Sequence, residues 1–391
     1  MLRKIGFTIL LFLLCVSVVA CGAADVIGDV SSETDASYGA EESSGNNVIE
    51  LSDIELPDES SRPSEHSKPD ISDTGTDQKP QTSWPKLTCS NPYIVTPQIA
   101  DNDELPIRSI KNVPRGSVQL FGRLDKSNEQ VASALSEIDV WLSSYDKNIG
   151  FFAYALDGTA AVAYNCEDSF FSACTIKAAY MLYCCLAVDQ GLADRNTVMY
   201  YQECYYHGGS GDIRLTEYGT PYTIETLIYK ALNISDNVAY EMLTAYFGYK
   251  GFNQFVNDLG CPSLNISRLW CYKMNAKDLC VIWREIYFYF QTETTMAKLY
   301  KKACTNTKFN YCALYLGESY SHKSGDNFGE KWPAYNDGAI IWADRPYVVA
   351  FLTRSEGTSK DEKTVNTISK IIYDRLMKPI YPPKVDPKEE L

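Results

Sequence analysis

The amino-acid composition changes sharply near residue 89, and this change decides which part of the chain can fold. Residues 22–86 contain 15 Asp or Glu side chains against 4 Lys or Arg, with many Ser and Pro and few large apolar residues. Such a segment cannot bury enough apolar surface to offset the loss of chain entropy. We therefore predict a disordered acidic linker over 21–88, with a hydrophobic core forming only after it.

The formal net charge of −14 carries little information about a partner, because most of it belongs to this linker. The chain has no basic patch with interleaved aromatic residues, so we predict no nucleic acid partner. It has no Cys-x-x-Cys pair and no His-rich cluster, so we predict no metal site, and we expect no cofactor.

The first 20 residues are typical of a signal peptide. Arg3 and Lys4 precede the apolar run 5–20, which is too short and too close to the terminus to favour a permanent membrane span. The residues Val-Val-Ala-Cys ending at Cys21 resemble a lipoprotein cleavage box. We expect an extracytoplasmic protein held at the cell membrane by lipidation of Cys21. The alternative is an ordinary signal peptide cut nearby.

From about residue 89 the chain is rich in Tyr, Phe, Trp and Leu, and its length suits one large or two closely packed lobes. Eleven of the 13 cysteines lie here. Exported proteins often form disulfides. An odd number of cysteines, two of which (Cys184 and Cys185) are adjacent, nevertheless fits a disulfide framework poorly. Free thiols are therefore our hypothesis.

Hydrophobic periodicity and turn signals predict the order of elements. Strands are expected at both ends and helices in the middle. The N-terminal part would contain a helix over 128–145 capped by Ser127 and a hairpin over 150–164 turning at Asp157-Gly158, and the middle would contain helices over 175–187, 223–232, 237–247 and within 251–303, with a loop over 208–211. The C-terminal part would contain strands over 318–324, 336–342 and 346–354, turns at 325–333 and 344–346, and a helix over 364–376.

This order predicts an α/β protein of the α+β type. An antiparallel sheet would be completed by N- and C-terminal segments, flanked by helices, with a helical lobe inserted between them. We place this domain at 128–378, an N-terminal extension at 89–127 and a flexible tail at 379–391.

Three short motifs occur in the domain: Cys174-Thr175-Ile176-Lys177, Ser235-Asp236-Asn237 and Lys323-Ser324-Gly325. Together they resemble the S-x-x-K, S-D-N and K-T/S-G signatures of class A β-lactamases and penicillin-binding D,D-peptidases. The separation of 61 residues between the first two motifs is similar to that of class A enzymes. The resemblance implies the β-lactamase/transpeptidase fold over most of 128–378. Cys174 stands where this family has its nucleophilic serine.

These residue types suit acyl transfer, which needs a nucleophile, a base and donors for the developing oxyanion. A thiol at a helix N-terminus has a lowered pKa, and Lys177 lies on the same helical face as Cys174. The backbone N–H of Cys174 would be one oxyanion donor.

The resemblance implies the remaining roles. Ser235 would relay a proton to the leaving nitrogen, with Lys323 adjusting the pKa of Ser235 across the cleft. Asn237 would bind the amide side chain of the substrate, and Lys323 and Ser324 its carboxylate. Gly325 would permit close approach of the ligand, and the N–H of Asp326 would be the second oxyanion donor.

Each motif also has a purely structural interpretation. Cys174 could be a small buried hydrophobic residue, Lys177 a solvated helix lysine, Ser235-Asp236 a helix N-cap and Lys323 a charge at a strand end. A Cys–His site using His207 or His322 is a further alternative.

Two departures from the family pattern limit the expected activity. The chain has no glutamate between Glu241 and Glu285, where class A enzymes carry the residue that activates the deacylating water; Asp258 is the nearest carboxylate. Sulfur is also larger than oxygen, and a misplacement of about 1 Å can cost about 10²-fold in rate. We therefore predict an acyl hydrolase or transferase that acts on β-lactams or the D-amino-acid ends of peptidoglycan peptides, without efficient class A turnover. The alternative is a degenerate relative that only binds cell-wall ligands or a partner.

Overall fold

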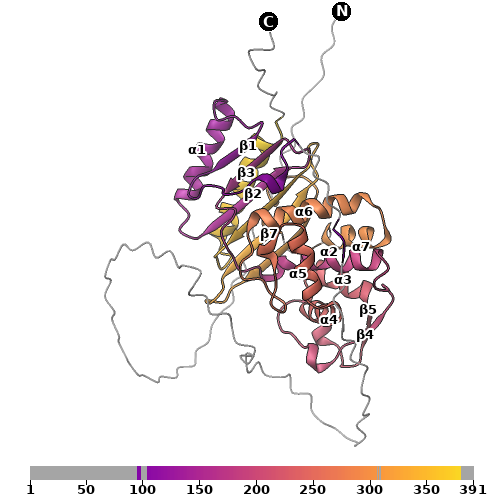
Figure 1. Cartoon of the computed structure of the whole chain (residues 1–391). Coiled ribbons are helices and arrows are strands. Elements are labelled where there is room, and N and C mark those ends of the chain that lie inside the picture. Colours follow the sequence, from indigo (N-terminus) through magenta and orange to yellow (C-terminus); the bar gives the residue numbers. More distant parts are fainter. Residues whose placement is uncertain (1–94, 98–103, 306, 308–309, 380–391) are drawn as a thin grey trace, which may run out of the picture. The chain divides into compact units, whose positions relative to one another are not determined.

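The computed structural model describes residues 95–97, 104–305, 307 and 310–379. All of them belong to the compact unit Lys79–Leu391 (Figure 1). The predicted signal peptide, Cys21 and the linker lie outside the described residues, as does nearly all of the predicted tail. Within the described residues, no helix is long and apolar enough to cross a membrane.

A six-stranded antiparallel sheet forms the centre of the fold, in the order β1-β3-β2-β8-β7-β6. Its strands come from both ends of the domain, as predicted: β1 (Gln119–Gly122), β2 (Ile149–Ala155), β3 (Ala160–Tyr164), β6 (Tyr320–Asn327), β7 (Ala334–Ile341) and β8 (Tyr347–Thr353). The β2–β3 hairpin turns at Asp157-Gly158, where Gly158 has a φ of 71°. In the strand order given above, β1 and β6 are the two edge strands.

Both faces of the sheet are covered, which explains why β2, β7 and β8 are buried along their whole length. On one face, Phe151 and Ala153 of β2 pack with α1 (Glu129–Ser143) and α8 (Ser359–Ile371), which continues as a π-helix (Ile372–Met377). On the other face, Phe152 and Tyr154 pack with the helical lobe, α6 (Ala276–Gln291) lying directly against the sheet. The alternation follows from the two-residue period of a strand.

The helical lobe lies between β3 and β6 in the chain, beside the sheet (Figure 1). It contains α2 (Ile176–Asp189), α3 (Ile224–Asn233), α4 (Asn237–Phe247), α5 (Lys250–Asp258) and α7 (Thr295–Thr305), and a small sheet of β4 (Val198–Tyr200) and β5 (Pro221–Thr223). The helix α2 is the centre of the lobe, because twelve of its residues are buried.

Several predicted boundaries were wrong for local reasons. Asn128, not Ser127, caps α1, since its side-chain oxygen accepts the N–H groups of Gln130 and Val131. The last helix begins five residues earlier than predicted, because Thr358 and Asp361 form a capping box. The strand β1 lies inside the predicted N-terminal extension and pairs with β3, so part of 89–127 belongs to the sheet.

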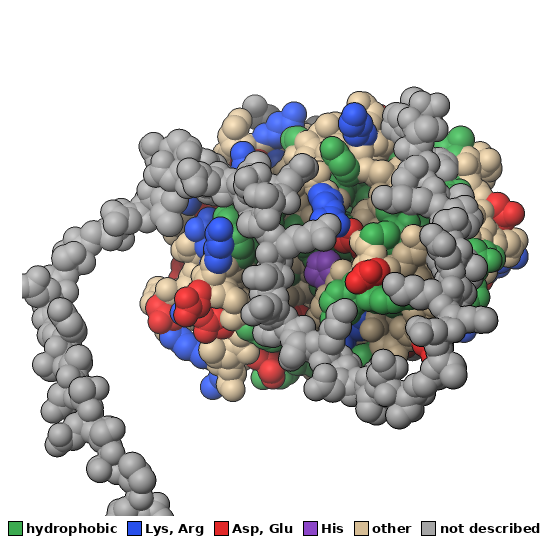
Figure 2. Space-filling view, turned by 90° about the horizontal axis from the view of Figure 1, so that it is seen from below, with side chains coloured by type: hydrophobic (Ala, Val, Ile, Leu, Met, Phe, Trp, Pro, Cys, Tyr) green, Lys and Arg blue, Asp and Glu red, His purple; other side chains and the backbone are tan. Residues whose placement is uncertain are grey.

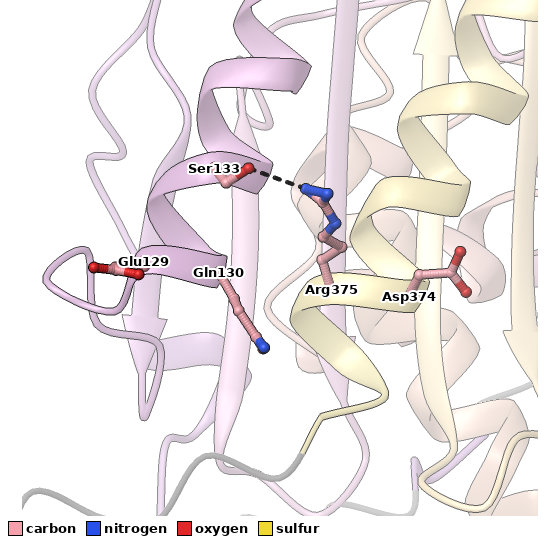
Figure 3. Close-up of a pocket in the computed structure, with 5 residues that line it drawn as sticks. All are labelled: Glu129, Gln130, Ser133, Asp374 and Arg375. Carbon is pink, nitrogen blue, oxygen red and sulfur yellow. Dashed lines mark hydrogen bonds between the residues drawn. The ribbon is translucent and has the colours of Figure 1, made fainter.

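An open depression lies between the N-terminal end of α1 and the π-helix (Figure 3). Glu129, Gln130 and Ser133 line one side and Asp374 and Arg375 the other, and Arg375 donates to the Ser133 hydroxyl at 3.3 Å. This depression involves none of the predicted site residues and lies on the face of the sheet away from the helical lobe.

Charges on the molecular surface are mixed. On the face shown in Figure 2, Lys and Arg side chains lie among Asp and Glu side chains and hydrophobic ones. Ion pairs between partly exposed groups also occur, such as Arg123–Glu104 and Arg195–Glu225.

Candidate active site

Cys174 lies in a 3₁₀ turn, Ala173–Thr175, immediately before α2. The prediction placed it in the first turn of the helix itself, so it is one element earlier than expected. Ala173 has a φ of 43°, which is uncommon for a residue with a side chain. A backbone hydrogen bond fixes the residue just before this turn, because the N–H of Ser172 donates to the carbonyl of Cys271 at 2.9 Å. The Cys174 side chain is half-buried, which rules out the fully buried core cysteine of the structural interpretation.

Lys177 lies on the first turn of α2 and is fully buried, so it is not a solvated helix lysine. Its ammonium donates to the carbonyl of Ser235 at 2.7 Å and to the side-chain oxygen of Asn237 at 2.6 Å. The Ser235 hydroxyl lies 3.4 Å away. The ammonium also lies 5.6 Å from the ring centre of Tyr240. The first two motifs therefore meet at a single buried cation.

The Ser235-Asp236-Asn237 motif connects α3 to α4. Ser235 has a φ of 56°, and Asp236 caps α4 by accepting the N–H of Ala239 at 2.9 Å. The cap is therefore Asp236, while the Ser235 hydroxyl faces Lys177. The side-chain amide of Asn237 donates to the carbonyl of Gly208 at 2.7 Å, so one of its hydrogens is already used.

The third motif lies on β6, at the free edge of the sheet. Lys323 and Ser324 are buried, and the Lys323 ammonium donates to the carbonyl of Ser324 at 2.6 Å. The strand continues to Asn327, although a turn was predicted from residue 325. A Cβ atom at Gly325 would lie 2.6 Å from the backbone nitrogen of Cys174 and 2.4 Å from that of Thr175. Glycine at this position thus lets the strand pack against the Cys174 turn.

Asp326 follows this contact on the same strand. Its side chain accepts a hydrogen bond from the Tyr311 hydroxyl at 3.0 Å. Because β6 is the last strand in the sheet, no strand of the described residues pairs with it on the side away from β7.

The electrostatics of the site favour an ionised thiol. Burial raises the pKa of Cys174, but the cations of Lys177 and Lys323 outweigh burial and bring it below the ordinary value. Burial lowers the pKa of Lys177, opposed by the nearby Cys174. Burial likewise lowers the pKa of Lys323 to about 8, again opposed by Cys174. A thiolate at this position would be stabilised by the two ammonium groups.

The pKa values of eight buried thiols are shifted in the opposite direction. The ten cysteines in the described part of the chain are all free. Burial raises the pKa of eight of them: Cys166, Cys184, Cys185, Cys261, Cys271, Cys280, Cys304 and Cys312. Cys174 is therefore distinguished from them by its chemistry as well as by its position.

Nothing in the contacts supports the Cys–His alternative. The ring nitrogens of His322 contact Asp337, at 3.0 Å, and Thr307. His207 contacts the carbonyl of Gly208. In the described residues, no group of His, Cys, Asp and Glu is arranged to hold a metal ion.

The segment between α5 and α6 has no Asp or Glu from 259 to 277. Glu241 is paired with Arg268, and the exposed Asp258 accepts from Gln254 at 2.6 Å. Both carboxylates, those of Glu241 and Asp258, therefore already have a side-chain partner.

Sequence reasoning missed several residues that hold the site together. The side-chain amide of Asn336, on β7, donates to the carbonyl of Phe171 at 2.8 Å and so ties the Cys174 segment to the sheet. Phe171 in turn contacts Tyr272 and Trp332. Such contacts have no local signal in the sequence, because they join segments that are far apart along it.

One protein-family model covers most of the domain built from the six-stranded sheet and the helical lobe. The model of the β-lactamase enzyme family matches residues 131–376, and the chain belongs to that family. No match was found among curated proteins.

Solved structures of low sequence identity share the fold. A β-lactamase from Sphaerobacter thermophilus is 20% identical and matches with a TM-score of 0.53, over 63% of this chain and 96% of that one. PBP-A is 18% identical, with a TM-score of 0.55 over 63% and 97%. A class A β-lactamase representative from Bacteroides cellulosilyticus is 17% identical, with a TM-score of 0.55 over 64% and 100%. The predicted mixed fold, with an antiparallel sheet and helices, is confirmed.

Proposed function

We propose that this protein is an acyl hydrolase or acyl transferase that forms a covalent acyl-enzyme on Cys174. Its substrates would be β-lactams or the D-amino-acid ends of peptidoglycan peptides. The observation that carries the proposal is the meeting of Cys174 and Ser235 at the buried ammonium of Lys177, with Gly325 of β6 packed on the same turn. A variant of PBP-A has been solved as an acyl-enzyme complex with penicillin G, which gives the proposal a precedent within the fold.

In the proposed reaction, the Cys174 thiolate attacks the carbonyl carbon of the amide and a C–S bond forms. The backbone N–H groups of Cys174 and Asp326 would stabilise the oxyanion. When the C–N bond breaks, the Ser235 hydroxyl would pass a proton to the leaving nitrogen and recover one from Lys177. The product is a thioester on Cys174, which water or an amine then cleaves.

Substrate binding would use the remaining motif residues. Lys323 and Ser324 would hold the carboxylate of the substrate, because a buried cation strongly favours an anionic partner. Asn237 would bind the substrate amide through the amide hydrogen that Gly208 does not use. The same amide already connects Lys177 to the loop over 208–211, so Asn237 also has a structural role.

Deacylation by water would be slow. No carboxylate from 259 to 277 is present to activate water, and Glu241 is paired with Arg268. A thioester reacts readily with amines, so acyl transfer or a long-lived acyl-enzyme fits the site better than rapid hydrolysis.

We further propose that the protein acts outside the cytoplasm, lipid-anchored through Cys21. The proposal rests on the charged start, the apolar run and the cleavage box within residues 1–21. Radiolabelled palmitate should be incorporated by the natural chain in its host cell and not by Cys21→Ala. Equal incorporation by both chains would contradict the anchor.

Labelling with a fluorescent penicillin tests the proposed activity. The native protein should form a covalent adduct, seen by intact mass, that Cys174→Ala does not form, and the lifetime of the adduct would separate a hydrolase from a trapped acyl-enzyme. Labelling of Cys174→Ser but not of the native protein would mean that the site is intact and the thiol inactive, which favours a binding protein. No labelling of any of the three would contradict the β-lactam proposal.

A further inference from the structure

Four half-buried aromatic side chains lie together beside the Cys174 turn: Phe171, Trp270, Tyr272 and Trp332, which we call the aromatic cluster. The ring centres of Phe171 and Tyr272 are 5.2 Å apart, and those of Tyr272 and Trp332 are 5.1 Å apart. Trp270 and Trp332 lie 6.3 and 6.2 Å from Phe171. The rings come from three separate segments: the chain before Cys174, the segment between α5 and α6, and the β6–β7 turn.

Hydrogen bonds on both sides connect the aromatic cluster to the Cys174 turn. Phe171 precedes Cys174 by three residues, and its carbonyl accepts from Asn336 of β7. The next residue, Ser172, exchanges hydrogen bonds with Cys271, the neighbour of Tyr272. The positions of the rings are therefore set by the same contacts that position Cys174.

The cluster also reaches the buried cation of the site. The ring of Trp270 packs 5.7 Å from that of Tyr240, and Tyr240 lies below the ammonium of Lys177. The ring centre of His207, which precedes the residue that accepts the Asn237 hydrogen bond, lies 5.9 Å from that of Trp270. Trp270 thus connects the aromatic cluster to the second motif.

Partial burial distinguishes these rings from ordinary core residues. Phe170 and Tyr240, close by, are fully buried, whereas all four members of the cluster remain partly exposed to solvent. Partly exposed aromatic side chains beside a reactive group are typical of the apolar part of a small-molecule site. The segment 259–277 contributes two of these rings and no carboxylate.

We propose that the aromatic cluster is a subsite for the side chain of the acyl donor, and that it selects donors with a flat aromatic group, such as an arylacetyl amide. The proposal rests on the proposed function for its chemistry. The anionic end of the donor would lie at Lys323 and Ser324 and its aromatic end on the cluster. A ring packed among these rings gains binding free energy beyond that of the area it buries.

The first test compares two penicillins that differ only in the side chain, phenylacetyl against acetyl, by the rate of adduct formation on Cys174. We expect the native protein to prefer the phenylacetyl compound by about 10-fold, as one well-packed ring allows. Tyr272→Leu and Trp332→Leu should lose most of this preference, since leucine fills space without a ring face. Tyr249→Ala, at an exposed tyrosine outside the cluster, should keep it, and thermal unfolding should confirm that each variant folds.

A second test does not depend on acylation. Calorimetry with Cys174→Ala should show that N-phenylacetylglycine binds about 10-fold tighter than N-acetylglycine, and Trp332→Leu in the same background should remove the difference. If this selectivity holds while no penicillin acylates the native protein, the subsite is right and the proposed reaction is wrong.

Two results would overturn the subsite. One is equal binding of the phenylacetyl and acetyl compounds in the calorimetric test. The other is cluster-dependent binding of an N-acetylglucosamine oligomer without selectivity for the phenylacetyl group, which would make the rings a sugar-stacking platform instead.

Discussion

At the scale of single residues, the main feature of the site is that three ionisable groups lie close together and largely away from water. The thiol of Cys174 is half-buried, and the ammonium groups of Lys177 and Lys323 are almost completely removed from water. Desolvation disfavours all three charged forms, yet a thiolate beside two cations is stabilised by both. The pKa of Cys174 falls below its ordinary value for this reason.

This charge balance predicts selective alkylation of Cys174. Iodoacetamide near pH 7 should modify Cys174 fastest among the buried and half-buried thiols, and mapping of alkylated peptides by mass spectrometry would measure it. Replacing Lys323 with Met should slow the modification several-fold, because one stabilising cation is lost. The melting temperature should not fall, since a methionine of similar volume carries no desolvation cost. Unchanged reactivity in Lys323→Met would contradict the electrostatic role.

The pKa of Lys323, about 8, predicts a pH limit on substrate binding. Below this pH the ammonium is charged and attracts the carboxylate of a penicillin; above it the charge is lost. The rate of acylation should therefore rise with ionisation of the thiol and fall again above about pH 8. Alkylation by uncharged iodoacetamide should show no falling limb, and a common falling limb for both reagents would assign the effect to Cys174 instead.

At the scale of elements, the site depends on how closely β6 approaches the turn before α2. Gly325 permits this approach, since any side chain there would meet the backbone nitrogens of Cys174 and Thr175. We expect Gly325→Ala to destabilise the fold by about 1–3 kcal/mol through overpacking and to reduce adduct formation on Cys174 by at least about 10²-fold. Gly329→Ala, at a glycine without a left-handed φ where a Cβ atom would meet only the Asn327 side chain at 3.6 Å or more, is the matched control in urea unfolding and in labelling. Normal labelling of Gly325→Ala would show that the close contact is not needed.

A second element-scale contact joins α4 to the loop beside the site. The Asp236 carboxylate accepts the N–H groups of Ala239, Asp212 and Ile213 at 2.8 to 3.0 Å. Loss of a cap and of two charge-assisted hydrogen bonds should make Asp236→Ala about 2–4 kcal/mol less stable. Chemical unfolding would measure the loss, and Asp258→Ala, at an exposed carboxylate, should cost well under 1 kcal/mol. Equal losses in the two variants would contradict the account.

At the scale of the whole molecule, the sequence predicted the architecture better than the details of the site. Strands at both ends and helices between them, with a turn signal at Asp157-Gly158, were enough for the sheet and the inserted lobe. The edge strand β1 was missed because its four residues stand alone, far from the hairpin that they pair with. Contacts such as Asn336 with Phe171 depend on the tertiary fold, and no local pattern could have indicated them.

The central claim is that Cys174 becomes acylated, and peptide-level mass spectrometry after incubation with penicillin G tests it most directly. The account predicts one modified peptide, carrying the penicilloyl group on Cys174, and a slow return to the free thiol that an added amine accelerates. An adduct on any other residue, or none on Cys174 while the protein remains folded, would contradict it.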